Sequence, residues 1–231
     1  MLILGLQKTT LLDYPGKVAS TIFTGGCNFR CPYCHNSDLV LSPGQMNAYS
    51  QEEIFEHLNN KKKVLDGVCI TGGEATLQPD LYDFIKKVKD IGLLVKLDTN
   101  GTNPFILKQL IDDDLLDYVA MDIKHCKEKY NDVCCSNTLD INLIQQSIDL
   151  LMSSNIEYEF RTTVIPEFHS RDDIISIGNW IKGAKSYHLQ AYRESDQVIN
   201  PVFSSPTIKT LTEYKNLLKD FVGSISIRGI D

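Results

Sequence analysis

Short apolar runs alternate with longer amphipathic segments along most of the chain. The short runs have the β-branched character and the bounding turn residues that are typical of buried strands. The expected strands are 18–24, 67–71, 93–97, 118–121, 156–164 and 185–191, with a final short strand at 224–228. The expected helices are 51–63, 79–89, one that begins at 104, 139–153, 171–182 and 207–221. Repeated βα units of this kind predict an α/β fold with a parallel sheet.

Specific residues mark some of the helix boundaries. Ser50 and Glu53 have the spacing of a capping box at the start of a helix. Pro79 and Asp80 suit the start of the next helix, and Gly92 suits its end. Six βα units are too few to close an eight-stranded α/β barrel, whose active sites lie at the carboxyl ends of the strands. We therefore expect functional residues in the loops that follow the strands.

The composition narrows the class of protein. The chain has 231 residues and no repeat or linker that divides it, so we expect one domain over 1–231, with an N-terminal extension at 1–17, a core at 18–195 and a C-terminal helix and strand at 196–231. The net charge of −7 offers no general attraction to nucleic acid or to a membrane, and neither is expected as a partner. No apolar run approaches the roughly 18 residues that span a bilayer, and no basic leader indicates a signal peptide. Seven cysteines, an odd number, do not form a disulfide framework, which predicts a reducing cytoplasm.

A cysteine loop that follows the first strand and Gly25-Gly26 carries the densest chemistry. Cys27, Cys31 and Cys34 have the spacing C-x3-C-x2-C. Four cysteines together ligate every iron of a [4Fe–4S] cluster. Three close thiols without an obvious fourth therefore predict a cluster with one iron open to a substrate, as a catalytic zinc has an open position.

Three plainer interpretations compete with this cluster. The dithiol Cys31-Pro-Tyr-Cys34 alone is a redox motif of the glutaredoxin kind, but such a domain has roughly 100 residues and leaves Cys27 idle. A structural zinc site needs four ligands, and His35, the nearest fourth donor, directly follows Cys34, which makes joint ligation awkward. Buried and inert cysteines are common, but three so close together, beside Gly, Pro and Arg, are not typical of them.

Polar residues also stand at or near the ends of the later strands. They are Gly72, Gly73, Glu74, Asp98, Asn100, Asp122, Lys124 and Arg161. Each has a plainer role, because glycines suit a tight turn, aspartates cap helices, and an arginine at the surface forms ion pairs that contribute little. The motifs gain weight only when they are taken together with the cysteine loop.

Together these stretches resemble the radical S-adenosylmethionine enzymes, whose signature is C-x3-C-x-aromatic-C, with Tyr33 at the aromatic position. The resemblance narrows to the activating enzymes of glycyl radical proteins, and most closely to those of anaerobic ribonucleoside-triphosphate reductase. The matching stretches, in family order, are 5–16, 27–36, 71–74, 98–101, 121–124 and 161–163. The resemblance implies a (β/α)6 partial TIM barrel whose open lateral side admits a large substrate.

The resemblance also implies the roles of the site residues. Cys27, Cys31 and Cys34 would hold the [4Fe–4S] cluster, whose fourth iron chelates the methionine amino and carboxylate groups of S-adenosylmethionine. The residues implied for the amino group are Gly72, Gly73 and Glu74, and those for the adenine are Tyr33, Cys34 and His35.

Further residues are implied around the carboxylate and the ribose of the same cofactor. Those near the carboxylate, in part through a monovalent cation, are Asp98, Asn100, Asp122, Lys124 and Arg161. The family's ribose-contacting histidine has no counterpart in 190–193, so Gln190 is the expected contact. His188 is expected on the other face of its strand.

The implied reaction begins with one electron from a reduced flavodoxin or ferredoxin. Reductive cleavage gives methionine and a 5′-deoxyadenosyl radical, which abstracts hydrogen from a glycine of a partner enzyme. The expected partner is the anaerobic ribonucleotide reductase, and the segment 7–15, which lacks helix or strand periodicity, is expected to form part of the surface that binds it. No catalytic side chain beyond the cluster and the cofactor is needed, since no acid/base step is involved.

Two other classes of function stay open. One is a radical S-adenosylmethionine enzyme that acts on a small molecule, and the other is a non-catalytic iron–sulfur electron carrier, against which the loops after the strands argue. Cys69 is expected in the core, and the adjacent Cys134 and Cys135 are poor ligands, with Cys126, for a second cluster. The histidines expected at the surface or in loops are His57, His125 and His169.

Overall fold

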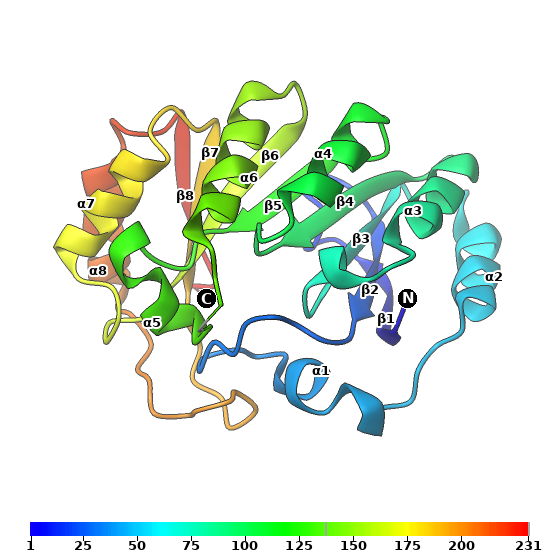
Figure 1. The fold of residues 1–231 in the computed structure, drawn as a ribbon, viewed down its shortest axis with the longest axis horizontal. Helices are drawn as coiled ribbons and strands as arrows, with labels where there is room; N and C mark the ends of the chain where they lie inside the picture. The colour runs from blue at the N-terminus through cyan, green and yellow to red at the C-terminus, as the bar shows by residue number, and fades with distance from the viewer. Residues whose placement is uncertain (137, 231) are drawn as a thin grey trace. The chain divides into compact units, whose positions relative to one another are not determined.

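The computed structural model describes residues 1–136 and 138–230, which group into two compact units. The first unit comprises 1–28, 36–99 and 103–119, and the second comprises 29–35, 100–102 and the described residues from Ala120 onward. Strands and helices alternate along the chain through both units (Figure 1). The structure therefore has the α/β character that the hydrophobic pattern predicts.

The first unit is built on strands in the order β1-β2-β3-β4. The strands β2 (Ala19–Thr24), β3 (Gly67–Gly72) and β4 (Leu94–Thr99) are parallel, whereas β1 (Ile3–Thr10) runs antiparallel to β2. The next strand, β5 (Tyr118–Asp122), begins in this unit and ends in the second. Parallel strands place their carboxyl ends at one edge, so the loops after β2, β3 and β4 emerge on the same side.

Helices follow the strands of the first unit as predicted. The longer ones are α2 (Gln51–Lys61), α3 (Leu81–Asp90) and α4 (Pro104–Asp112). The predicted capping box of α2 is confirmed, because the Ser50 hydroxyl accepts from the Glu53 N–H at 3.1 Å and the Glu53 carboxylate accepts from the Ser50 N–H at 2.7 Å. The turn after α3 is confirmed at Gly92, whose φ of +85° favours glycine.

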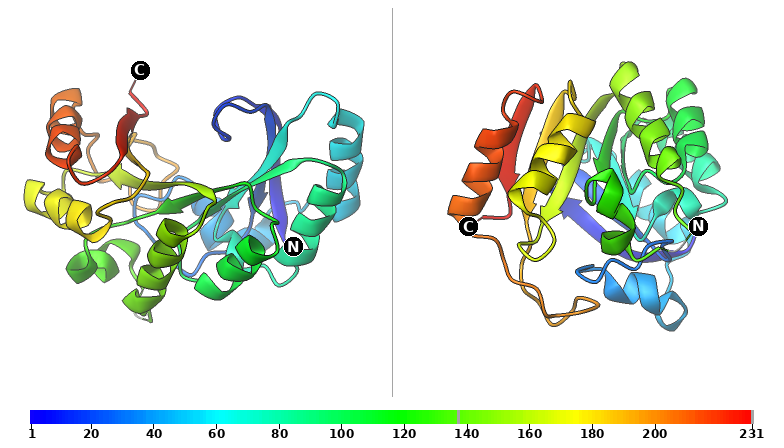
Figure 2. Two further views of the ribbon diagram at one scale, coloured as in Figure 1. Left: turned by 90° about the horizontal axis from the view of Figure 1, so that it is seen from above. Right: turned by 60° about the vertical axis from the view of Figure 1, so that its left-hand side comes forward.

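The second unit contains three adjacent parallel strands, β6 (Glu157–Val164), β7 (Ser186–Ala191) and β8 (Ser224–Arg228). Its helices are α5 (Tyr130–Cys134), α6 (Ile141–Ser153), α7 (Arg171–Trp180) and α8 (Ile208–Leu218). The helices α7 and α8 lie side by side next to β7 and β8 (Figure 2). Their buried leucine and isoleucine side chains provide the apolar face that covers these strands.

The predicted strands are confirmed, but three elements differ from the prediction. The segment 7–15 was expected to lack strand structure, whereas Gln7–Thr10 complete β1, which pairs with β2. Two short helices, α1 (Ser37–Leu41) and α5, were not predicted, because five residues are too few to show helical periodicity. No helix in 1–136 or 138–230 combines the length and the apolar character needed to cross a membrane.

Candidate functional site

In the first unit, the turn that leads into the cysteine loop is hydrogen-bonded to the turn after β3. The Gly73 N–H donates to the Thr24 carbonyl at 2.8 Å, and the Glu74 N–H donates to the Gly26 carbonyl at 2.8 Å. Gly72 has a φ of +111°, and a Cβ at position 73 would lie 1.9 Å from the Gly26 oxygen. Only glycine allows this approach, so Gly72 and Gly73 hold the turn that precedes Cys27 against the turn after β3.

Glu74 is buried in the same turn, with 1% of its surface exposed. Its Oε1 accepts hydrogen bonds from the N–H and the hydroxyl of Thr76, at 3.1 and 2.6 Å, and from the hydroxyl of Thr99 at 2.7 Å. The carboxylate therefore also caps the short 3₁₀ turn Ala75–Leu77. These three donors hold it in one orientation, which is what a binding group at a strand end requires.

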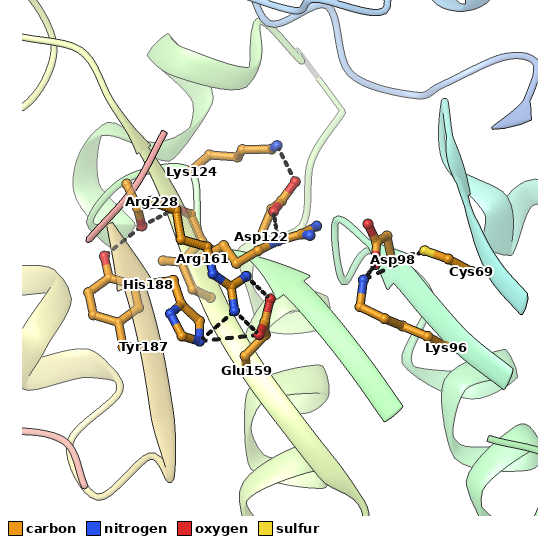
Figure 3. A network of polar contacts seen from close by, with 12 residues as sticks. Cys69, Lys96, Asp98, Asp122, Lys124, Glu159, Arg161, Tyr187, His188 and Arg228 are labelled. Carbon is orange, nitrogen blue, oxygen red and sulfur yellow. Dashed lines mark hydrogen bonds and ion pairs between the residues drawn. The ribbon is translucent and has the colours of Figure 1, made fainter. Parts of the chain in front are cut away.

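β4 carries Asp98 to its carboxyl end, where the carboxylate is ion-paired with Lys96 (Figure 3). Lys96 is 2% exposed, and its Nζ lies 3.6 Å from the Sγ of Cys69. Cys69 is fully buried, which confirms the prediction that it belongs to the core. The role of Lys96 was not predicted from the sequence, although a lysine two residues before Asp98 on the same strand shares its face.

Two of the motif cysteines belong to the second unit and stand in one tight turn. The Cys34 N–H donates to the Cys31 carbonyl at 3.0 Å, and the Arg30 N–H donates to the Cys134 carbonyl at 2.9 Å. Cys31 is buried and Cys34 is partly exposed. Cys27, in the first unit, is also partly exposed. The backbone of the loop is thus fixed at 30–34, and the end of α5 contributes to fixing it.

The two motif residues beside these cysteines have different surroundings. The Tyr33 side chain is buried, and no hydrogen-bond partner for its hydroxyl exists among the described residues. Burial raises the pKa of Tyr33 well above its ordinary value, with a further increase from Cys31, although the ammonium of Lys124 opposes it. The His35 ring is hydrogen-bonded to the Arg193 carbonyl at 2.9 Å.

Asp122, Lys124 and Arg161 form one charged group in the second unit. Asp122 accepts from the Lys124 ammonium at 2.8 Å and from the Arg161 Nε at 3.0 Å (Figure 3). Burial alone would raise the pKa of Asp122, but the two cations lower it to about 2. Burial would lower the pKa of Lys124, but Asp122 raises it well above its ordinary value. All three groups are therefore charged at neutral pH, and together they have a net positive charge.

The loop that carries Lys124 is held by two histidines. The Nδ1 of His169 accepts from the Ile165 N–H at 3.1 Å, which leaves Nε2–H to donate to the Lys124 carbonyl at 3.0 Å. The His125 ring stacks on that of His169, with centroids 4.9 Å apart. Both histidines are in loops, as predicted, and each is almost completely buried. Burial lowers the pKa of His169 to about 4.

His125, Cys126 and Asp173 bring three potential metal-ligating atoms within 4.8 Å of one another. Their donors already have protein partners, because the Cys126 N–H donates to the Nδ1 of His125 at 2.8 Å and the Lys129 ammonium pairs with Asp173 at 2.7 Å. Asp173 also accepts from the N–H of Ser170 at the start of α7. This cluster therefore connects the loop after β5 to α7.

The prediction that His188 faces away from the site is wrong. His188 stands opposite Arg161 in the β6–β7 register, and its Nε2 lies 3.1 Å from the Oε2 of Glu159, which shares the Arg161 face of β6. Glu159 is fully buried and accepts two hydrogen bonds from Arg228 of β8, at 2.6 and 2.8 Å (Figure 3). Gln190 lies on the same face, two residues after His188.

The Asn100 side chain, which was expected near a cation, holds its own loop. Its Oδ1 accepts from the N–H of Thr102 at 3.0 Å and from the hydroxyl of Thr102 at 2.7 Å. This is the geometry of an Asx turn. The cofactor role of Asn100 stays a prediction.

The comparisons with known proteins agree with this geometry. Residues 21–180 match the model of the Radical SAM superfamily. A protein of Methanocaldococcus jannaschii named as a glycyl-radical enzyme activating enzyme is 34% identical over 236 residues, which cover 100% of this chain and 97% of that protein. The chain belongs to the Radical SAM superfamily. It is an enzyme of the glycyl-radical activating group within that superfamily.

Two further relatives carry related names. The pyruvate formate-lyase-activating enzyme of Clostridium pasteurianum is 27% identical over 187 residues, which cover 78% of this chain and 76% of that enzyme. A solved domain of the pyruvate-formate lyase-activating enzyme from Bacteroides vulgatus aligns with a TM-score of 0.56 at 19% identity and covers 71% of this chain and 99% of that domain. The structural likeness confirms the fold of these enzymes, a partial barrel of βα units.

This family implies a [4Fe–4S] cluster and S-adenosylmethionine, and the described residues fit both. The cysteines provide the thiolates that such a cluster requires. The positive group around Lys124 and Arg161, together with the unpartnered hydroxyl of Tyr33, suits a carboxylate. The buried carboxylate of Glu74 suits an ammonium. Each end of an amino acid thus has matching groups in the chain.

Proposed function

We propose that this enzyme generates a glycyl radical on a partner protein by radical S-adenosylmethionine chemistry. The observation that carries the proposal is the backbone pairing of the turn before Cys27 with the Gly-Gly-Glu turn, because it places the start of the expected cluster motif beside the expected amino-group site. The similarity to an activating enzyme over the whole chain supports it.

In this proposal Cys27, Cys31 and Cys34 are the protein ligands of the cluster. When bound, the cluster would pass one electron to S-adenosylmethionine for its reductive cleavage, and a glycine of the partner would supply the hydrogen atom that is abstracted. No side chain of the chain is proposed as an acid or a base. The role of the protein is to bind the cofactor, to orient it and to exclude water.

The chain's own residues bind the two ends of the cofactor's methionine moiety. Lys124 and Arg161 hold the carboxylate, and their positions are fixed because Asp122 pairs with both of them. The hydroxyl of Tyr33 donates a further hydrogen bond to the same carboxylate, which would give this buried group its partner. Glu74 and the backbone of 72–73 hold the amino group. The remaining proposed contacts are Cys34 and His35 to the adenine, Gln190 to the ribose, and Asp98 and Asn100 near the carboxylate.

The partner that we propose is an anaerobic ribonucleotide reductase, with a reduced flavodoxin or ferredoxin as the electron donor. Relatives of this chain that are named as activating enzymes of pyruvate formate-lyase support a partner that is itself an enzyme. A monovalent cation is not part of the proposal, because Asp98 and Asp122 are already paired with cationic side chains. A cytoplasmic location stays a prediction.

The test uses protein that is reconstituted anaerobically with iron and sulfide. Dithionite and S-adenosylmethionine are added, and 5′-deoxyadenosine is measured. The anaerobic ribonucleotide reductase of the same organism is then included, and its glycyl radical is sought by electron paramagnetic resonance. The Cys31→Ala variant should yield neither product nor radical. The matched control is Cys135→Ala, an exposed cysteine outside the motif, which should behave as the wild type.

Each outcome separates the candidate functions. A glycyl radical that depends on Cys31 supports the proposal. Formation of 5′-deoxyadenosine without a radical on any glycyl radical enzyme would replace the activase with an enzyme that acts on a small molecule. A full cluster with no 5′-deoxyadenosine under any condition would leave an electron carrier.

A further inference from the structure

Lys96 is a buried cation that the proposed mechanism does not use. It lies in the middle of β4, between Val95 and Leu97, and only 2% of its side chain is exposed. Lysine is almost never buried in this way unless it is paired. An unbranched apolar residue such as methionine has a similar length and would not carry the cost of a desolvated ammonium. Length and apolar character alone therefore do not explain a lysine at this position, and its charge needs a reason.

The geometry indicates what the charge does. Lys96 and Asp98 are two residues apart on one strand, so both side chains lie on the same face, and they form an ion pair (Figure 3). Cys69, opposite Lys96 in the β3–β4 register, also lies close to the ammonium. A thiol is a weak acceptor, so the carboxylate of Asp98 is the stronger partner. Asp98 is more exposed than Lys96, at 14%, and stands at the carboxyl end of the strand. The ammonium therefore approaches the carboxylate from the strand interior.

A carboxylate at a cofactor site attracts an inorganic cation when no protein group neutralises it. An alkali cation that approached Asp98 would meet the fixed ammonium and be repelled by it. We propose that Lys96 is a built-in counter-ion of Asp98, and that it makes the binding of S-adenosylmethionine independent of potassium and other alkali cations. This inference rests on the proposed function, since it concerns the site of the same cofactor. Lys96 is thus a positioning residue that acts through Asp98.

The test compares the wild type with Lys96→Met in cluster-loaded protein. The dissociation constant of S-adenosylmethionine is measured by anaerobic equilibrium dialysis in potassium chloride and in tetramethylammonium chloride at equal ionic strength. The change that the cofactor causes in the resonance spectrum of the reduced cluster gives a second readout. The matched control is Lys89→Met, which removes an ion-paired lysine of the first unit, 2.8 Å from Asp117.

The wild type and Lys89→Met should bind equally well in the two salts, within about twofold, because the counter-ion is part of the chain. Lys96→Met should bind at least tenfold more weakly in tetramethylammonium, and potassium should restore most of this loss by entering the vacated place beside Asp98. A purely structural role for Lys96 would not produce this rescue by potassium. The milder variant Lys96→Gln, which can still donate to Asp98, replaces Lys96→Met if that protein does not retain its cluster.

Two results would overturn the inference. One is a wild-type protein whose dissociation constant for S-adenosylmethionine rises fivefold or more when potassium is replaced by tetramethylammonium, a result that needs no variant. The other is a Lys96 variant that binds equally well in both salts. Absence of binding and of 5′-deoxyadenosine for the wild type in either salt would instead refute the proposed function, and this inference with it.

Discussion

His169 should make the stability of the protein depend on pH below neutrality. Burial lowers its pKa from 6.5 to about 4, so the unfolded chain takes up this proton at a higher pH than the folded chain. A group of this kind destabilises the folded state as the pH falls from about 6.5 towards about 4, since only the unfolded state gains a proton there. Protonation would also remove the Nδ1 acceptor of the Ile165 N–H.

The linkage relation gives the size of the effect. With pKa values of 6.5 and about 4, lowering the pH from 7 to 5 should reduce the free energy of unfolding by about 2 kcal/mol through His169 alone. We expect the variant His169→Gln to lose this part of the pH dependence. Its amide can still donate to the Lys124 carbonyl, which the histidine now contacts at 3.0 Å.

The assay is urea unfolding of the cluster-free protein at pH 7 and pH 5, followed by circular dichroism. The matched control is Tyr214→Phe, which removes the hydroxyl that donates to the His169 carbonyl at 2.6 Å but adds or removes no group that titrates between these pH values. This control should be destabilised by a similar amount at both pH values. Equal pH dependence in the wild type and in His169→Gln would refute the reasoning.

Three further predictions concern the two units separately. Arg228→Met leaves the buried Glu159 carboxylate without its guanidinium and should lower the free energy of unfolding by about 3 kcal/mol. In thermal melting, the double variant with Glu159→Met should recover most of this loss, and an unchanged melting temperature in the single variant would contradict the prediction. Gly73→Ala places a Cβ 1.9 Å from a backbone oxygen and should reduce the iron bound after reconstitution severalfold. The control Gly44→Ala has no atom within 4 Å of its Cβ and should bind as much iron as the wild type, and equal iron contents in the two variants would rule out the close approach. Because the pKa of Asp122 is lowered from 3.8 to about 2, its ionised form should add about 2 kcal/mol to the free energy of unfolding above pH 4, and this contribution is lost as the pH falls to 2. A difference in unfolding free energy between the wild type and Asp122→Asn that is the same at pH 6 and pH 2.5 would exclude this.

The strands could be predicted where burial on both faces leaves a short run rich in apolar and β-branched residues. β2 and β3 are of this kind, because most residues in them are buried. β1 could not, since its Gln7, Lys8 and Thr9 are exposed in succession and show no alternation. Its strand conformation comes from hydrogen bonds to β2, which are tertiary contacts.

The candidate site divides in the same way. The cysteine loop and the Gly-Gly-Glu turn are local motifs, so their residues could be named from spacing alone. The burial of His125 and His169 depends on two loops that are distant in sequence, and a polar residue without a visible partner is expected at the surface. The role of Lys96 was not predicted either, because its partner Asp98 was expected to act at the cofactor and not to pair with a lysine.

The charges in each unit suggest why a lysine stands at position 96. In the second unit, Lys124 and Arg161 outweigh Asp122 by one positive charge, which suits the carboxylate of an amino acid. In the first unit, the positive charge of Lys96 balances the negative charge of Asp98. The carboxylate of Glu74 therefore gives these three side chains one net negative charge, which suits an ammonium. A tethered ammonium is already in place before the ligand arrives, whereas a free alkali cation would have to bind and be ordered at the same time. The lysine therefore fixes the charge of the first group independently of the salt around the protein.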